Sequence, residues 1–161
     1  MSKETRDNMY KKSTDELENI LENTRPEKFG EFLKEHSEEI AGTEKSFSEY
    51  FKEKAKDHGF LLQDVFLRGD IPEKYGYKLV SGEKHTNQRD TILRMCFGAD
   101  LTLDETQHVL KLYGMPALYA RVPRDAFLMS CFNNKPDSII EVNVLLHKNR
   151  MDTIRSCGTQ D

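Results

Sequence analysis

Side chains able to contact the bases or phosphates of a nucleic acid recur at helical spacing near the middle of the 161-residue sequence. They are Glu73, Lys74, Tyr77 and Lys78. Residues four positions apart lie on the same side of an α-helix, and the apolar pair that follows, Leu79 and Val80, would face the opposite way into a core. A short helix with this polar side could enter a DNA major groove with its N-terminal residues near base edges. The alternative is a solvated helix face that carries one packed aromatic ring.

Polar residues on either side of this segment could hold the phosphate backbone. Gln63 stands at the start of the preceding helix, where a side-chain amide and the helix N-terminus can both contact a phosphate. The start of the next helix is flanked by further polar residues, for which phosphate contacts and a polar loop with a helix cap are both open interpretations. The sequence thus predicts these DNA contacts: Gln63, Glu73, Lys74, Tyr77, Lys78, Lys84, Asn87 and Arg89.

No pattern in the sequence favours catalysis, a metal or a cofactor. The five histidines are scattered, without an HExxH spacing, and no glycine-rich phosphate loop occurs. Three cysteines without a CxxC pair predict neither a zinc site nor a disulfide framework, and Cys131 is expected to be a small buried residue. The adjacent Arg124 and Asp125 are expected to form an intramolecular ion pair or a cap, and Asn143 a hydrogen bond in the core or an interface.

The net charge of −4 argues mildly against a nucleic-acid protein, but the charge is unevenly distributed. Residues 1–50 carry 8 basic and 13 acidic side chains, whereas residues 74–94 carry five basic and two acidic ones. The five basic residues are Lys74, Lys78, Lys84, Arg89 and Arg94. This segment offers about three to five phosphate contacts, while the acidic N-terminal third would repel DNA and is expected to lie away from it.

The ends of the helices are well marked in the sequence. Each of four capping boxes pairs a Ser or Thr with a Glu three residues later and opens an apolar pattern with a period near 3.6: Ser13/Glu16, Ser46/Glu49, Thr102/Glu105 and Ser138/Glu141. Gly59, Gly82 and Gly114 stand where helices would stop. We expect helices near residues 14–23, 26–40, 46–58, 61–68, 72–80, 87–98, 103–113, 123–133 and 138–148, and a frayed tail after residue 151.

The remaining composition indicates an ordinary cytoplasmic globular protein. Apolar residues make up 37% and charged residues 32% of the chain, which is polar but not typical of disorder. The N-terminal residues contain no apolar signal-peptide core, and no apolar run approaches the ~18 residues of a membrane span.

These features resemble the XRE (lambda-repressor-like) family of helix-turn-helix regulators. The similarity starts with the glutamine at 63, the apolar turn residue Ile71 and the glycine at 82. It continues through 87–90, 97–105, 110–114 and 138–146 and is similar to a Firmicutes subgroup with a C-terminal helical extension, so that it covers about residues 47–154. Family members usually carry a small residue where the two helices cross. Val65 and Phe66 stand near that position here, which predicts a wider or shifted crossing.

The resemblance implies an all-α protein: a lambda-repressor-like helix-turn-helix bundle with N- and C-terminal helical extensions. We expect an acidic appendage over 1–42, the DNA-binding domain over 43–114 and the helical extension over 115–161. The implied function is that of a sequence-specific transcriptional regulator. Its partners would be double-stranded DNA and a possible homodimer or protein partner, with no membrane and no cofactor. The alternative is a protein-interaction adaptor on the same scaffold without specific DNA binding.

Overall fold

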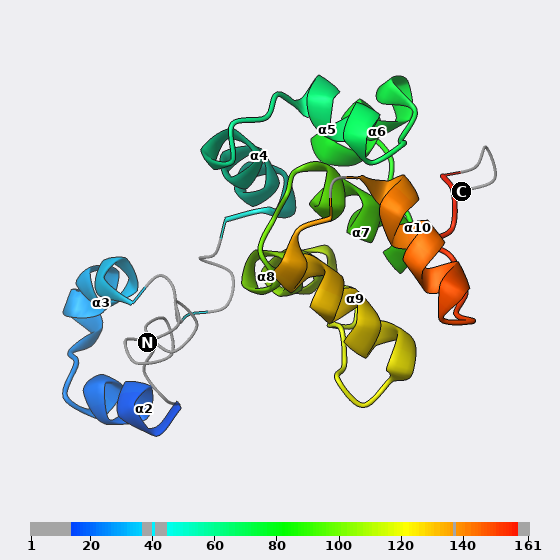
Figure 1. Ribbon diagram of the computed structural model, residues 1–161. Helices are drawn as coiled ribbons and strands as arrows, with labels where there is room; N and C mark the ends of the chain where they lie inside the picture. Colours follow the sequence, from blue (N-terminus) through cyan, green and yellow to red (C-terminus); the bar gives the residue numbers. More distant parts are fainter. Residues whose placement is uncertain (1–13, 37–39, 41–44, 137, 158–161) are drawn as a thin grey trace. The chain divides into compact units, whose positions relative to one another are not determined.

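The computed structural model describes residues 14–36, 40, 45–136 and 138–157 (Figure 1). The regular structure of these residues is helical and contains no strand, which confirms the all-α expectation. The chain divides into two compact units, Met1–Lys45 and Ser46–Asp161.

The bounds of the helices agree with the expected ranges to within about two residues, except over 26–40. The first unit contains α2 (Thr14–Glu22), the 3-10 turn η1 (Pro26–Lys28) and α3 (Phe29–Glu35). The second contains α4 (Phe47–Asp57), α5 (Leu62–Arg68), α6 (Glu73–Ser81), α7 (Arg89–Gly98), α8 (Leu103–Tyr113), α9 (Pro123–Asn134) and α10 (Ile139–Lys148). Among the described residues no helix is long and apolar enough to cross a membrane.

The first unit contains an aromatic contact at the end of α3. Phe32 and His36 are both buried, with ring centroids 4.7 Å apart. The expected helix over 26–40 is shorter than predicted, because Pro26 begins a 3-10 turn and the backbone leaves the helical region at His36 (φ −121°). Ser13, the expected cap of α2, lies outside the described residues.

The other three capping boxes stand at the starts of α4, α8 and α10. At α8 the two arms are reciprocal: Glu105 N–H donates to Thr102 Oγ1 over 3.1 Å, and Thr102 N–H donates to Glu105 Oε1 over 2.9 Å. Ser46 and Ser138 each accept the backbone N–H three residues later, at α4 and α10. These bonds satisfy amides that would otherwise lack a partner in the first turn.

Left-handed residues end many of the helices. The three expected glycine stops, Gly59, Gly82 and Gly114, have φ values of 84°, 84° and 80°. Four further ends use residues that carry a side chain and show no such signal in the sequence: Asp70 after α5, Asp100 after α7, Lys135 after α9 and Arg150 after α10, with φ values of 53°, 56°, 46° and 57°.

Helix α7 is the core of the second unit. All of its residues from Thr91 onward are buried, and it packs against α5, α8 and α10 (Figure 1). A side chain on Gly98 would collide with the carbonyl oxygen of Val65 on α5, and one on Gly69 would lie 2.6 Å from the carbonyl oxygen of Arg94. The backbones of α5 and α7 therefore meet without side chains between them.

Arg94 on α7 is a buried charged residue, with 3% of its surface exposed. Its Nη1 donates to the carbonyl oxygen of Gly69 over 3.1 Å. Its Nε and Nη2 donate to the carbonyl oxygens of Arg155 and Ile154 over 2.7 and 2.8 Å. Ile154 N–H in turn donates to Asn143 Oδ1 over 2.7 Å, which confirms the expected hydrogen bond of that asparagine. The expectation of a frayed tail is thus wrong for 151–157, because a buried guanidinium holds this irregular segment.

We expect Arg94→Met to lower the free energy of unfolding by about 3 kcal/mol or more, since three carbonyl oxygens lose their donor and an unsatisfied buried group costs about 1–3 kcal/mol. Urea unfolding followed by circular dichroism measures the change. Arg150→Met is the matched control, because Arg150 is exposed and the same substitution there should stay within about 0.5 kcal/mol. Equal stability of the two variants would contradict the anchoring role.

A second polar contact joins the end of α4 to the start of α8. His58 Nε2 lies 2.7 Å from Glu105 Oε1, and Lys54 Nζ lies 3.9 Å from Glu105 Oε2. Burial raises the pKa of Glu105, but the hydrogen bonds from Thr102 and His58 and the charge of His58 outweigh it. The pKa of this carboxyl group therefore lies below its ordinary value of 4.5.

This carboxylate should make the stability depend on pH. A carboxyl group whose pKa is lowered by folding stabilises the fold above its ordinary pKa of 4.5, and the contribution disappears as the pH falls through the folded-state value. We expect Glu105→Gln to lower the free energy of unfolding by about 1–2 kcal/mol at neutral pH and to converge with the wild type in acid. Urea titrations across the acidic range test this, and parallel curves for the two proteins would contradict it.

Candidate nucleic-acid interface

The turn between α5 and α6 is fixed by its backbone and by one apolar anchor. Asp70 is left-handed, and Ile71 N–H donates back to the carbonyl oxygen of Phe66 over 2.8 Å. Ile71 is 6% exposed, as expected for a turn residue that points into the core. Pro72 then caps α6, which begins at Glu73. The two short helices are therefore held at a defined angle.

Gly76 is the small residue at the crossing of α5 and α6. A Cβ atom there would lie 2.6 Å from the ring of Phe66, which is itself 1% exposed. The large residues at 65 and 66 thus do not force the helices apart, because the opposing helix supplies the space. A glycine inside a helix costs roughly 1 kcal/mol relative to alanine, and here it permits the ring to pack against the α6 backbone.

The residues expected to read DNA lie on the outer side of α6. Glu73 and Lys74 are exposed. Tyr77 is 43% exposed, and its ring packs edge-on against Phe66 with centroids 5.0 Å apart. Lys78 keeps 29% of its side chain exposed, with its Nζ 4.0 Å from Glu83 Oε1. The core-facing pair expected on the opposite side, at 79 and 80, is 1% exposed at both positions.

The loop after α6 holds two more of the expected residues at the surface. Lys84 N–H donates to the carbonyl oxygen of Lys78 over 3.0 Å, and Lys84 Nζ lies 5.8 Å from the centre of the Tyr75 ring. Asn87 is exposed. Gln63 is also exposed, on the first turn of α5.

Tyr113 anchors this loop to the bundle. Its hydroxyl accepts the backbone N–H of Thr86 over 2.9 Å, and the His85 ring stacks on its ring with centroids 4.5 Å apart. Burial raises the pKa of Tyr113, so the hydroxyl stays protonated at neutral pH. The loop is therefore fixed between α6 and α7.

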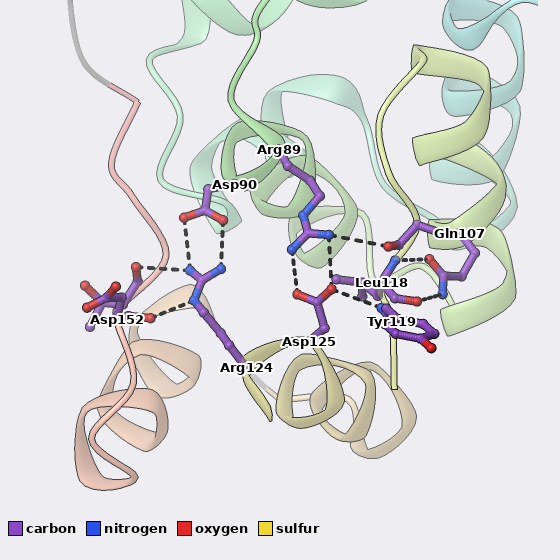
Figure 2. A network of polar contacts seen from close by, with 10 residues as sticks. Arg89, Asp90, Gln107, Leu118, Tyr119, Arg124, Asp125 and Asp152 are labelled. Atoms are coloured by element: carbon purple, nitrogen blue, oxygen red, sulfur yellow. Dashed lines mark hydrogen bonds and ion pairs between the residues drawn. The ribbon is translucent and has the colours of Figure 1, made fainter. Parts of the chain in front are cut away.

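Arg89, the last expected contact, is engaged inside the protein. Figure 2 shows its guanidinium against Asp125, with Nη1–Oδ2 and Nη2–Oδ1 distances of 3.1 and 2.5 Å. Arg124 makes a corresponding bidentate ion pair with Asp90, with Nη1–Oδ1 and Nη2–Oδ2 distances of 3.1 and 3.0 Å. The expected ion pairing of 124 and 125 thus occurs, but each residue pairs with the start of α7 rather than with its neighbour. These two ion pairs join the N-termini of α7 and α9.

The basic character of the segment 74–94 is weaker on the surface than in the sequence. Arg94 is buried and Arg89 is bound to a carboxylate, which leaves the three lysines at 74, 78 and 84 to face solvent. Arg155, a further exposed cation that the sequence did not indicate, lies at the start of α7. Its Nη1 lies 3.2 Å from Gln88 Oε1, and its backbone N–H donates to Asp90 Oδ2 over 2.8 Å. No local pattern marks this arginine, because its neighbours are more than sixty residues away in sequence.

In the part of the chain that the structure describes, no group of three or more His, Cys, Asp or Glu side chains could hold a metal ion. Comparison of the chain with models of known protein families, with curated proteins and with solved structures finds no match. The function must therefore be inferred from the surface of α6 and its surroundings.

We expect Gly76→Ala to destabilise the second unit although alanine favours helices, because overpacking a core costs about 1–3 kcal/mol. Thermal unfolding followed by circular dichroism measures the shift. Gly30→Ala on α3 is a matched control, since a Cβ there meets nothing within 4 Å. Phe66→Leu in the Gly76→Ala background should recover part of the loss. A Gly76→Ala protein as stable as the wild type would show that the crossing can widen without cost.

Proposed function

We propose that the second unit binds double-stranded DNA as a helix-turn-helix protein of the XRE type, with α6 in the major groove, and acts as a transcriptional regulator. The outward side of α6 supports this function most directly. The acidic, basic and phenolic side chains of Glu73, Lys74 and Tyr77 share that side. On its other side, the helix packs through Gly76 against the Phe66 ring. A rigid reading helix places its polar groups reproducibly against base edges.

Each of these groups has a suitable partner in DNA. Lys74 can donate to the acceptors of guanine, and Glu73 can accept from the amino group of cytosine. Tyr77 presents both a ring and a hydroxyl. Lys78, on the same helix, can contact a base edge. Lys84 in the following loop can contact a phosphate, and the Gln63 amide can contact the neighbouring backbone. Arg89 is left out of the proposed contacts, because its guanidinium is already shared with a carboxylate.

We expect salt-sensitive binding with a small slope. The three lysines bring about three positive charges to the DNA, whichever group each of them bonds, so the logarithm of the binding constant should fall against the logarithm of salt with a slope of about −3. Fluorescence anisotropy with fragments from the region upstream of its own gene measures the slope. A flat dependence, or no binding at low salt, would overturn the proposed function.

Substitutions on α6 can distinguish a loss of DNA recognition from a loss of folding. Lys78→Ala and Tyr77→Ala should each weaken specific binding about tenfold or more, since a base-edge contact is worth about 1–3 kcal/mol, and leave the melting temperature close to that of the wild type. Leu79→Ala should unfold much of the protein, because truncating a buried leucine costs about 2–5 kcal/mol. Lys56→Ala on α4 is the control for loss of one positive charge. Full DNA affinity in both outer variants would exclude α6 as the reading element.

Exposed leucines on α5 favour a second candidate function, that of a protein-interaction adaptor. Leu61, just before α5, and Leu67 on α5 are 73% and 81% exposed, and the Lys78–Glu83 contact reduces the positive charge of the proposed DNA surface. An adaptor would lose its partner with Leu67→Glu and would be indifferent to Lys74→Ala. A DNA-binding protein should respond in the opposite way, so that the same two variants distinguish the functions.

A further inference from the structure

The irregular segment that follows α10 is fixed by several hydrogen bonds around Arg155. The backbone N–H of this residue donates to Asp90 Oδ2 over 2.8 Å, and its carbonyl oxygen accepts from Arg94 Nε over 2.7 Å. The preceding residue, Ile154, is 2% exposed, and its own N–H and carbonyl oxygen are bonded to Asn143 and Arg94. The backbone of both residues therefore has a defined position although it belongs to no helix.

The side chain that this backbone presents is an exposed cation. Arg155 Nη1 donates to the neutral amide of Gln88, with a distance of 3.2 Å to Oε1. Among the described residues its guanidinium has no carboxylate partner, whereas Arg89 and Arg124 are each paired with an aspartate (Figure 2). Because each of those pairs is neutral, Arg155 adds a positive charge to the start of α7 that neither pair cancels.

The bond to Gln88 places this charge at the end of the loop that carries two of the proposed DNA contacts. Lys84 and Asn87 lie in that loop, which ends at Gln88, the residue that precedes α7. Gln88 N–H donates to the hydroxyl of the buried Thr86 over 3.0 Å. The loop and the Arg155 guanidinium are therefore held next to each other by a short series of hydrogen bonds.

We infer that Arg155 contacts a DNA phosphate beside the one proposed for Lys84, so that the segment after α10 forms part of the DNA-binding surface. The inference rests on the proposed function of α6. A guanidinium presents a planar set of N–H donors that matches the oxygen atoms of a phosphate, and the contact with Gln88 occupies only Nη1. Because the backbone of this residue is already fixed, little freedom of the main chain is lost when the phosphate binds.

Fluorescence anisotropy with the full chain and the DNA fragments described above tests this contact. Arg155 should add about one to the slope that the three lysines give, and Arg155→Gln should remove that increment and weaken binding about fivefold. The loss should be the same for specific and unrelated sequences, because a phosphate contact carries no sequence information. Arg155→Lys keeps the charge, so it should keep the wild-type slope and lose only part of the affinity.

Both variants should keep the wild-type melting temperature, because the hydrogen bonds at this position are made by the backbone. Arg150→Gln is the matched control, since it removes an exposed arginine at the other end of the same segment and should change the affinity less than about twofold. An Arg155→Gln protein with the affinity and slope of the wild type would overturn the inference and leave the proposed function intact. An equal loss in Arg150→Gln would also overturn it, since the effect would then follow net charge alone. A wild type that binds no DNA would overturn the proposed function and this contact with it.

Discussion

Two glycines allow the backbones of α5 and α7 to touch, and the position of the outer helices follows from that contact. Gly98 faces the Val65 carbonyl, and Gly69 faces the Arg94 carbonyl. The Arg94 side chain then uses the same crossing, since it donates to Gly69 and to the C-terminal segment together. A charge this deeply buried is tolerated because each of its nitrogens donates to a carbonyl oxygen. The crossing thus fixes α5, and the arginine brings the end of the chain to the same place.

The orientation of α6, the candidate DNA-reading helix, depends indirectly on the contact between α5 and α7. α6 packs on α5 through Gly76 and Phe66, so its orientation is set by a helix that α7 has already fixed. The Tyr77 ring lies on the same phenylalanine. A change at the buried side of Phe66 would therefore shift both the helix and one of its outward side chains. The DNA-binding surface that we propose is in this sense an extension of the core.

The sequence was sufficient to predict the helices but not the groups to which Arg89 and Arg94 bond. Thr102, Glu105 and Gly114 bound α8 through contacts with near neighbours, so their roles can be seen in short stretches of sequence. Arg94 bonds to a residue 61 positions away and Arg89 to one 36 positions away, and nothing local distinguishes them from the lysines at 74 and 84. The basic run was therefore expected to offer about three to five phosphate contacts, whereas three of its five cations, the lysines, face solvent. The role of Gly76 is also non-local, because it depends on the Phe66 ring that faces this glycine from another helix.

The modest charge of the proposed DNA surface makes the base-edge contacts of α6 decisive. The three lysines give a weak, salt-sensitive association, and a chain of net charge −4 gains little from its remaining surface. The affinity for a particular DNA sequence must then come from the outward side chains of α6. Their position is set by the contact of Gly76 with the buried Phe66 ring, so the packing of the core determines what the surface can recognise.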